Sequence, residues 1–242
     1  MIISKQNSLI KEVRSLQSKK FRDNLSRYVV EGVKMVNEAF TLGQKVLTII
    51  STEKCLEHLN VGDFKIELVS QEVYDSISDE KSPQGVLAVI EKPSNSVHSP
   101  TSSCLLLDGV ADPGNMGTII RTMACAGYKD LYITSTCADP FSPKAVRSSM
   151  SGIYHVSVHQ ADTETLLKAI NLPLVVADMN GKDVFKDKPK GDFCLVIGNE
   201  AHGVSETVEK QAVHTVKIPM EKGMESLNAA VSAGILMYAL KN

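Results

Sequence analysis

Apolar residues along the first part of the chain follow two alternating patterns. Short apolar runs predict strands, and segments whose apolar residues lie three or four positions apart predict helices. Leu9, Val13 and Leu16 show the helical spacing, and Ser4 or Asn7 can cap that helix. Strands are expected at residues 28–32, 46–50, 66–69 and 86–90, and helices at 9–18, 33–42, 53–59 and 71–76. This alternation predicts a small α/β domain over residues 1–92.

A polar segment interrupts the pattern at residues 93–103, which read PSNSVHSPTSS. Two prolines, five serines and few apolar residues are typical of a linker or an exposed connection. We therefore expect a domain boundary here, with a second domain over residues 104–242.

The second domain repeats the alternation of apolar runs and helical segments. Alternating strands and helices predict a parallel sheet with helices on both faces, so the fold class is α/β. A turn is expected at residues 179–181 and a charged loop at 182–190. Strands are expected at 104–107, 131–134, 154–158, 174–178, 193–197 and 213–218, and helices at 118–126, 143–150, 163–170 and 226–240.

The stretch from Cys104 to Arg121 joins a buried strand to a helix through a segment rich in glycine. Residues 108–117 hold three glycines and a proline, so we expect a loop that places a ligand at the end of the strand. Two common motifs do not fit. A phosphate-binding loop would need Lys and Ser or Thr directly after Gly114, and a dinucleotide fingerprint would need glycine at position 112.

Composition bounds the compartment and the chemistry. The formal net charge is −2, and the N-terminus lacks the apolar region of a secretory signal. The longest apolar stretch, residues 229–240, is too short to span a bilayer. Five cysteines without a C-x-x-C pattern indicate reduced thiols in a cytoplasm. Only His155 and His159 approach a metal-binding spacing, and we expect no metal.

Charge is distributed unevenly along the chain. Residues 1–34 carry eight Lys or Arg and three acids, whereas residues 35–100 carry five basic and ten acidic residues. A basic segment on a nearly neutral protein is a candidate contact for a polyanion, although a solvated helix face gives the same pattern. Lys11, Lys19, Lys20 and Arg22 lie off the apolar stripe of the first helix, so we expect them to face outward.

Three polar clusters follow strands of the second domain. They comprise Asn115 with Arg121, then Gly198 to Glu200, and then the segment from Pro219 to Asn228. Each has a structural explanation as a turn, a first-turn acid or a helix cap. In a parallel sheet, however, all three would meet at the carboxyl ends of the strands, where ligands bind.

The three clusters also carry a family resemblance. The segments DPGNMGTIIRTMACAG, LVIGNEAHGVS and IPMEKGMESLNAAVSAGI resemble, in order and spacing, the motifs of the SpoU-type RNA ribose methyltransferases of the SPOUT class. The resemblance covers residues 104–242, and the first domain is similar to the ribosomal-protein-like RNA-binding domain of longer members. It implies methylation of a guanosine ribose 2′-hydroxyl in large-subunit ribosomal RNA. A transfer RNA methyltransferase and a non-catalytic RNA-binding assembly protein are the alternatives.

The same resemblance implies a deep trefoil knot, bound S-adenosylmethionine and an active site completed across a homodimer. It assigns Arg121 to the reacting hydroxyl, as a base or as an anchor, and four further residues to orienting roles. The implied catalytic residues are Arg121, Asn115, Glu200, Ser226 and Asn228; the implied cofactor-binding residues are Gly198, Ile218, Leu227, Ala177 and Gly203. The basic segment would then contact RNA phosphates through Lys11, Arg14, Lys19, Lys20, Arg22 and Arg27.

Overall fold

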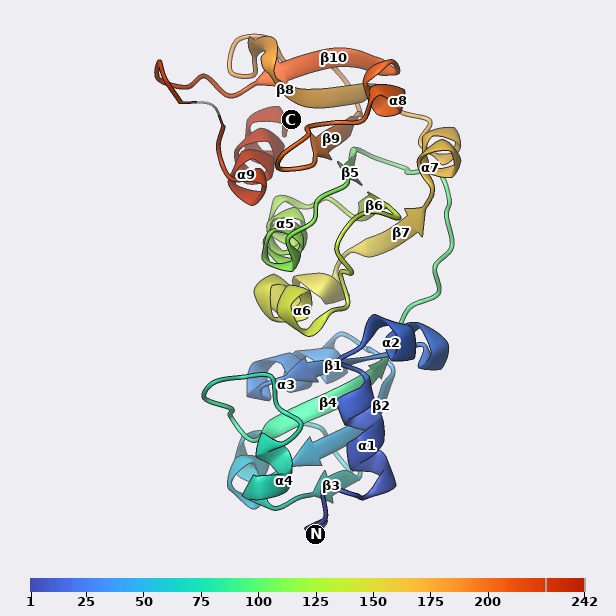
Figure 1. The fold of residues 1–242 in the computed structure, drawn as a ribbon, viewed down its shortest axis with the longest axis vertical. Helices are drawn as coiled ribbons and strands as arrows, with labels where there is room; N and C mark the ends of the chain where they lie inside the picture. The colour runs from blue at the N-terminus through green and yellow to red at the C-terminus, as the bar shows by residue number, and fades with distance from the viewer. Residues whose placement is uncertain (225, 242) are drawn as a thin grey trace. The chain divides into compact units, whose positions relative to one another are not determined.

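The computed structural model describes residues 1–224 and 226–241 (Figure 1). Glu225, which belongs to the third motif, and Asn242 lie outside the described residues. The chain packs as two compact units. The first comprises residues 1–94 and 139–154, and the second comprises residues 95–138 and the chain from His155 onward. A segment between two strands of the predicted second domain therefore packs with the first unit.

The first unit is a four-stranded sheet with the order β1-β4-β2-β3 (Figure 1). Strand β4 runs antiparallel to β1 and β2, and β3 runs parallel to β2. The strands are β1 Arg27–Glu31, β2 Val46–Ser51, β3 Ile66–Leu68 and β4 Val86–Glu91. The helices are α1 Ser8–Ser15, α2 Lys19–Leu25, α3 Val33–Thr41, α4 Gln71–Asp75 and α6 Pro143–Ser149, with 3₁₀ turns η1 Glu53–His58 and η2 Met150–Tyr154.

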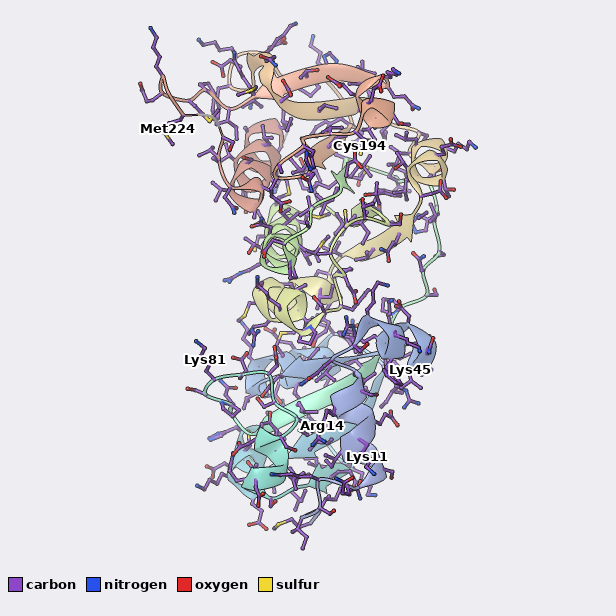
Figure 2. All side chains as sticks on the ribbon, viewed as in Figure 1. Lys11, Arg14, Lys45, Lys81, Cys194 and Met224 are labelled. Atoms are coloured by element: carbon purple, nitrogen blue, oxygen red, sulfur yellow. The ribbon has the colours of Figure 1, made fainter. Side chains whose placement is uncertain are left out.

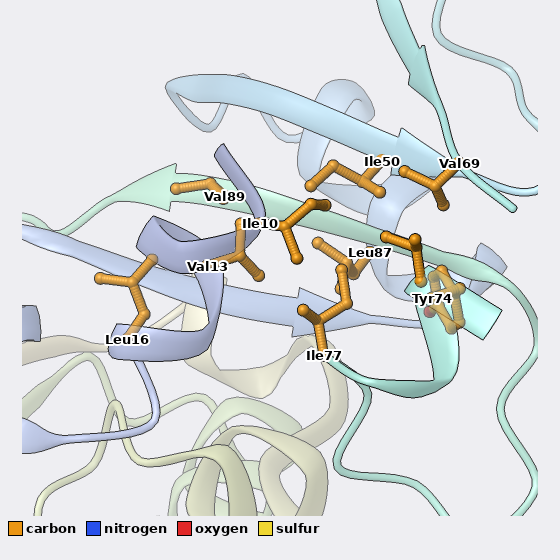
Figure 3. Close-up of a cluster of buried hydrophobic side chains, with 10 residues drawn as sticks. Ile10, Val13, Leu16, Ile50, Val69, Tyr74, Ile77, Leu87 and Val89 are labelled. Atoms are coloured by element: carbon orange, nitrogen blue, oxygen red, sulfur yellow. The ribbon is translucent and has the colours of Figure 1, made fainter. Parts of the chain in front are cut away.

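Helix α1 covers one face of this sheet through its apolar stripe. Asn7 caps the helix, as predicted, because its side-chain oxygen accepts a hydrogen bond from the Leu9 amide at 2.9 Å. Figure 3 shows the stripe pointing into a cluster with side chains from β2, β4 and α4. The labelled members are Ile10, Val13, Leu16, Ile50, Val69, Tyr74, Ile77, Leu87 and Val89. The predicted periodicity therefore identifies the core face of α1.

Helix α2 was not predicted, and it changes the role of Arg22. The Arg22 side chain is only 3% exposed, so the expectation that it faces outward is wrong. Its guanidinium lies 2.6 Å from an Asp139 carboxylate oxygen and donates hydrogen bonds to the carbonyls of Leu16 and Gln17. A buried guanidinium needs such a full set of acceptors. Arg22 therefore fastens α2 within the first unit.

Replacing Asp139 by asparagine is expected to lower the free energy of unfolding by about 3 kcal/mol or more, because the Arg22 charge would stay buried without its counter-ion. Urea denaturation measures the change. Asp79→Asn is the control, since Asp79 pairs with Arg147 at an exposed site and such pairs contribute at most about 1 kcal/mol. Equal losses in the two variants would show that the Arg22 pair contributes no more than a surface contact.

The second unit is a six-stranded sheet with the order β10-β8-β9-β5-β6-β7, and all of its paired strands are parallel, as predicted. Helices α7 and α8 pack on one face, while α5 packs beside α9 on the other (Figure 1). The strands are β5 Cys104–Asp108, β6 Asp130–Thr134, β7 Ser157–Ala161, β8 Leu174–Asp183, β9 Cys194–Gly198 and β10 Ala212–Lys217. The helices are α5 Pro113–Ala126, α7 Thr163–Ala169, α8 Glu206–Glu209 and α9 Ala229–Leu240.

Two strands of this sheet differ from their predicted bounds. Strand β7 begins at Ser157 rather than at residue 154, because the chain to Tyr154 still forms the turn η2. Strand β8 continues to Asp183 instead of turning at residues 179–181. Its pairing with β10 jumps from Val176 to Lys182, so the residues between them leave the ladder as a bulge within the strand.

The predicted linker is partly fixed to the second unit. The Asn95 side chain exchanges two hydrogen bonds of 2.8 Å with the Gln160 backbone. The Nδ1 atom of buried His159 lies 2.6 Å from the Ser96 carbonyl, which only accepts, so Nδ1 must donate. Its Nε2 atom lies 3.1 Å from an Asp130 carboxylate oxygen. Together with a ring nitrogen of His98, these atoms form a group of three possible metal ligands, all within 4.8 Å of one another. We assign this cluster to holding the segment on β6 and β7.

Candidate active site

The first motif begins a helix earlier than predicted. Helix α5 starts at Pro113, so the prediction of a loop through Gly117 is wrong for its second half. The Asp112 carboxylate caps the helix by accepting from the Asn115 amide at 2.8 Å, and proline suits the first helical position. The turn that remains contains Gly109, whose φ of 80° favours glycine. Asn115 is therefore held in the first turn of α5.

Side chains from all three motifs form one chain of hydrogen bonds. The Asn115 amide nitrogen donates to Glu200 at 2.9 Å, and the Asn228 amide nitrogen donates to the Asn115 oxygen at 2.9 Å. The Asn228 oxygen meanwhile caps α9 by accepting from the Ala230 and Val231 amides. Helix α9 thus starts at Ala229, with Asn228 rather than Ser226 as its cap. The structure therefore joins the three predicted strand-end clusters.

Glu200 is the anionic member of this chain. Burial of its carboxylate opposes ionisation, but the hydrogen bond from Asn115 and those from the Ala111 and Asp112 amides outweigh burial and lower the pKa of Glu200. Because the folded-state pKa is depressed, these hydrogen bonds contribute stability above the unfolded-state pKa. That contribution is lost as the pH falls through the folded-state value. Glu200 therefore remains a carboxylate at neutral pH.

A cavity of about 540 Å³ opens beside this chain of hydrogen bonds. It lies between the ends of β8, β9 and β10 and the start of α9, where the β8 bulge contributes Ala177 and Met179. All five predicted cofactor residues line it: Ala177, Gly198, Gly203, Ile218 and Leu227. Three of the predicted catalytic residues also line it: Glu200, Ser226 and Asn228. The structure thus gathers the second and third motifs around one cavity.

The loop after β9 is shaped by a close backbone approach. Asn199 and Gly203 exchange backbone hydrogen bonds of 2.8 and 2.9 Å. A Cβ atom at Gly198 would lie 2.3 Å from the Gly203 carbonyl carbon, so only glycine fits there. The Asn199 side chain donates to the Gly109 carbonyl at 2.7 Å, which ties this loop to the first motif. Asn199 was not among the predicted site residues, although it belongs to their second cluster.

Arg121 stands apart from the cavity. It lies six residues beyond Asn115 on α5, its side chain is exposed, and it is not part of the cavity lining. Among residues 1–224 and 226–241 it has no hydrogen-bond or ion-pair partner. The structure therefore leaves a free guanidinium on α5, the helix that also carries Asn115.

The basic N-terminal segment is less available than its sequence predicts. Arg14 donates to the Ser76 carbonyl and hydroxyl, Arg27 pairs with Glu12, and Lys19 pairs with Asp23. Together with buried Arg22, these contacts occupy four of the six predicted RNA-binding residues. Lys11, which Figure 2 labels on α1, and Lys20 are exposed and have no side-chain partner in the described part of the chain.

None of the described helices is long and apolar enough to cross a membrane. All five cysteines are free, and four of them are buried.

The profile of the SpoU rRNA Methylase family matches residues 102–238, which is more than half of the chain. The profile of the MRM3-like substrate binding domain matches residues 7–88. The second match lies within residues 1–92, and the first begins in the segment that was expected to link the domains.

Individual relatives are similar to this chain over nearly its full length. The chain is 28% identical to the 23S rRNA (guanosine(2553)-2'-O)-methyltransferase RlmP of Bacillus subtilis, covering 99% of this chain and 98% of the relative. The AdoMet-bound rRNA methyltransferase from Sinorhizobium meliloti is 29% identical, with a TM-score of 0.88 over 99% of this chain and 96% of that chain. A solved RNA 2'-O ribose methyltransferase is 27% identical, with a TM-score of 0.83 over 99% and 97%. On the match of its C-terminal half, the chain belongs to the SpoU rRNA methylase family.

Proposed function

We propose that this protein transfers the methyl group of S-adenosylmethionine to a ribose 2′-hydroxyl of RNA, and that the target is a guanosine of large-subunit ribosomal RNA. The observation that carries the proposal is the cavity beside the joined chain Glu200–Asn115–Asn228. Family membership and the full-length similarity to a 23S rRNA ribose methyltransferase support the reaction and the substrate.

The cavity fits S-adenosylmethionine in size and chemistry. A volume of about 540 Å³ lies within the range of small-molecule sites. Apolar Ile218 and Leu227 offer a surface for the adenine ring, and the absence of a side chain at Gly198 keeps the loop to Gly203 tight. We propose that these residues and Ala177 hold the cofactor through apolar contacts and backbone groups.

The protein's own residues have two tasks in this reaction. Bound S-adenosylmethionine supplies an activated methyl group, so the residues must align the ribose hydroxyl and favour loss of its proton. An arginine is almost never deprotonated, so we assign Arg121 the role of a cationic anchor that lowers the pKa of the hydroxyl. Asn115, Glu200, Ser226 and Asn228 would orient the RNA and the two loops around the cavity.

A homodimer would complete this site. Arg121 lies outside the cavity lining, so an RNA ribose has to be brought to both. Helix α9 is apolar on nearly every side, and Val231 and Tyr238 on it are half-exposed. An apolar surface of this kind is typical of an interface. We propose that this face pairs with a second copy and places Arg121 of one protomer beside the cavity of its partner.

A trefoil knot is part of the same proposal. A Cβ atom at Gly181 would lie 2.6 Å from the Val216 carbonyl carbon, and one at Gly198 would lie 2.3 Å from the Gly203 carbonyl carbon. Glycine at both positions allows the backbone segments to approach closely, which is compatible with a knot. The free cysteines support a reducing compartment, and we place the protein in the cytoplasm.

The N-terminal unit would contact RNA phosphates through Lys11 and Lys20, the two predicted RNA-binding lysines that have no partner among the described residues. Replacing Lys11 and Lys20 together by alanine is expected to weaken RNA binding and to reduce the salt slope of log K by about 1.5, because two phosphate contacts are lost. Binding titrations at several salt concentrations measure the slope. The control is Lys54→Ala with Lys65→Ala, an equal charge change outside α1 and α2. Equal slopes in the two double variants would place the RNA contact elsewhere.

The choice of substrate is tested by competition. Labelled S-adenosylmethionine is incubated with the protein and with equal amounts of unmodified 23S ribosomal RNA and transfer RNA. The proposal predicts label in the ribosomal RNA. Label confined to transfer RNA would keep the reaction and overturn the substrate, and binding of both without label would favour the non-catalytic RNA-binding alternative.

A further inference from the structure

The last two residues of β8 and the loop that follows combine exposed lysines with an exposed aromatic ring. We call residues 182–190 the basic loop. It carries Lys182, Lys186, Lys188 and Lys190 against only two acids, and Phe185 stands among the lysines with 57% of its surface exposed. Neither the cofactor cavity nor the N-terminal basic segment includes any of these side chains.

Buried side chains and backbone hydrogen bonds hold the basic loop in a defined conformation. Val184 and Pro189 are buried and anchor it. The Val184 amide donates to the Lys217 carbonyl at 3.0 Å. The Asp183 carboxylate accepts from the Phe185 amide at 3.0 Å, and the Asp183 carbonyl accepts from the next two amides. These hydrogen bonds form a turn that fixes the backbone of Phe185 while its ring stays in solvent.

The lysines of the basic loop are only partly engaged in ion pairs. Lys182 pairs with Asp187 at 2.8 Å at an exposed site, where such pairs contribute little. Lys186 lies 3.4 Å from Asp183, whose carboxylate is half-buried. Lys188 and Lys190 have no partner among the residues that the structure describes. The loop therefore presents a positive surface around an aromatic ring.

The loop lies at the rim of the cavity. Strand β8 lines the cavity through Ala177 and Met179 and continues into the basic loop. Strand β10 lines the cavity through Val216 and pairs with the end of β8. Lys217 itself belongs to the cavity lining, and its carbonyl holds Val184. The basic loop is therefore joined through the backbone to residues that line the cavity.

We propose that the basic loop is a binding site for unpaired RNA, in which Phe185 stacks on a base and Lys188 and Lys190 contact the adjoining phosphates. The proposal rests on the proposed function, since it places part of the substrate beside the reacting site. Aromatic rings flanked by cations are the usual means of holding single strands, because every base offers a flat face for stacking. Paired RNA would not offer a free base at this position.

The chain contains no tryptophan, which makes a direct test possible. In the variant Phe185→Trp the new indole is the sole tryptophan at the proposed stacking position. Its fluorescence is expected to be quenched in a saturable way by a short oligoadenylate, and much less by the same strand annealed to oligouridylate. Val213→Trp is the control, because Val213 is exposed near the opposite end of β10. Equal quenching in both variants, or by both forms of RNA, would overturn the proposal. Quenching by polyglutamate would also overturn it, since it would show a site for anions in general.

A second test measures substrate use. Phe185→Leu with Lys188→Ala and Lys190→Ala is expected to raise the KM for RNA by about tenfold or more, with the Kd for S-adenosylmethionine unchanged. The control is Lys129→Ala with Lys168→Ala; both are exposed, and Lys129 directly precedes β6, which β9 and β5 separate from β8 in the sheet. If methyl transfer proceeds with an unchanged KM, the loop proposal fails and the proposed function stands. If oligoadenylate quenches Phe185→Trp but neither the wild-type protein nor any variant transfers a methyl group, the loop proposal stands and the proposed function fails.

Discussion

Replacing Arg121 by alanine is expected to lower the turnover number for RNA methylation by a factor of roughly 10² to 10⁴, the range for a group that assists proton transfer. The expectation follows from its guanidinium, which is exposed, has no partner within residues 1–224 and 226–241, and lies on the helix that carries Asn115. Because Arg121 does not line the cavity, the affinity for S-adenosylmethionine should change little. Single-turnover methylation assays measure the first quantity and calorimetry the second.

Arg121→Lys separates charge from geometry. A cationic anchor that uses the forked guanidinium should be restored only partly by lysine, which offers a single ammonium group. Lys129→Ala serves as the control for loss of an exposed cation away from the site. If Arg121→Ala keeps full turnover, Arg121 has no role at the reacting hydroxyl.

Replacing Gly198 by alanine is expected to weaken binding of S-adenosylmethionine by about tenfold to a hundredfold. The added Cβ atom would lie 2.3 Å from the Gly203 carbonyl carbon and 2.5 Å from its oxygen, so the loop after β9 must move. Overpacking of this kind costs about 1 to 3 kcal/mol, and here the displaced loop lines the cavity. Calorimetric titration of the variant with S-adenosylmethionine gives the change in affinity.

Gly43→Ala provides a control for this substitution. A Cβ atom at Gly43 would meet nothing within 4 Å, and Gly43 belongs to the first unit, away from the cavity lining. Its φ of 65° makes alanine strained there, so the variant controls for a general loss of stability. Its affinity for the cofactor should stay close to that of the wild-type protein. A Gly198→Ala protein that binds as tightly as Gly43→Ala would show that the loop does not hold the cofactor.

The periodic pattern predicts most of the sheet framework. Fully buried strands such as β5 and β9 read as uninterrupted apolar runs, so their positions and parallel pairing follow from the sequence. Helix α2 was missed because it is only seven residues long, about two turns, and buries no apolar side chain. It is fixed instead by Arg22, whose partner Asp139 lies far away in the sequence. The start of α5 was missed because glycines at 114 and 117 suggest a loop, while the cap at Asp112 and Pro113 decides for a helix.

The candidate site also contains features that the sequence predicts and features that it does not. Family motifs and strand ends predict which residues gather, and the structure joins Asn115, Glu200 and Asn228 by hydrogen bonds. The tie from Asn199 to Gly109 depends on the path of two loops and has no periodic signal. Exposure of the basic segment was overestimated because charge alone does not reveal which cations already have partners inside the fold.

Methyl transfer to a ribose 2′-hydroxyl is tested directly by the chemistry of RNA hydrolysis. The protein is incubated with methyl-labelled S-adenosylmethionine and total RNA from a strain lacking the gene, and the RNA is then hydrolysed in alkali. Alkaline cleavage needs a free 2′-hydroxyl, so ribose methylation is predicted to leave the label in alkali-resistant dinucleotides of large-subunit RNA that yield 2′-O-methylguanosine on full digestion. Label released in mononucleotides would place the methyl group on a base and contradict ribose methylation, and absence of label from every RNA would contradict the proposed activity itself.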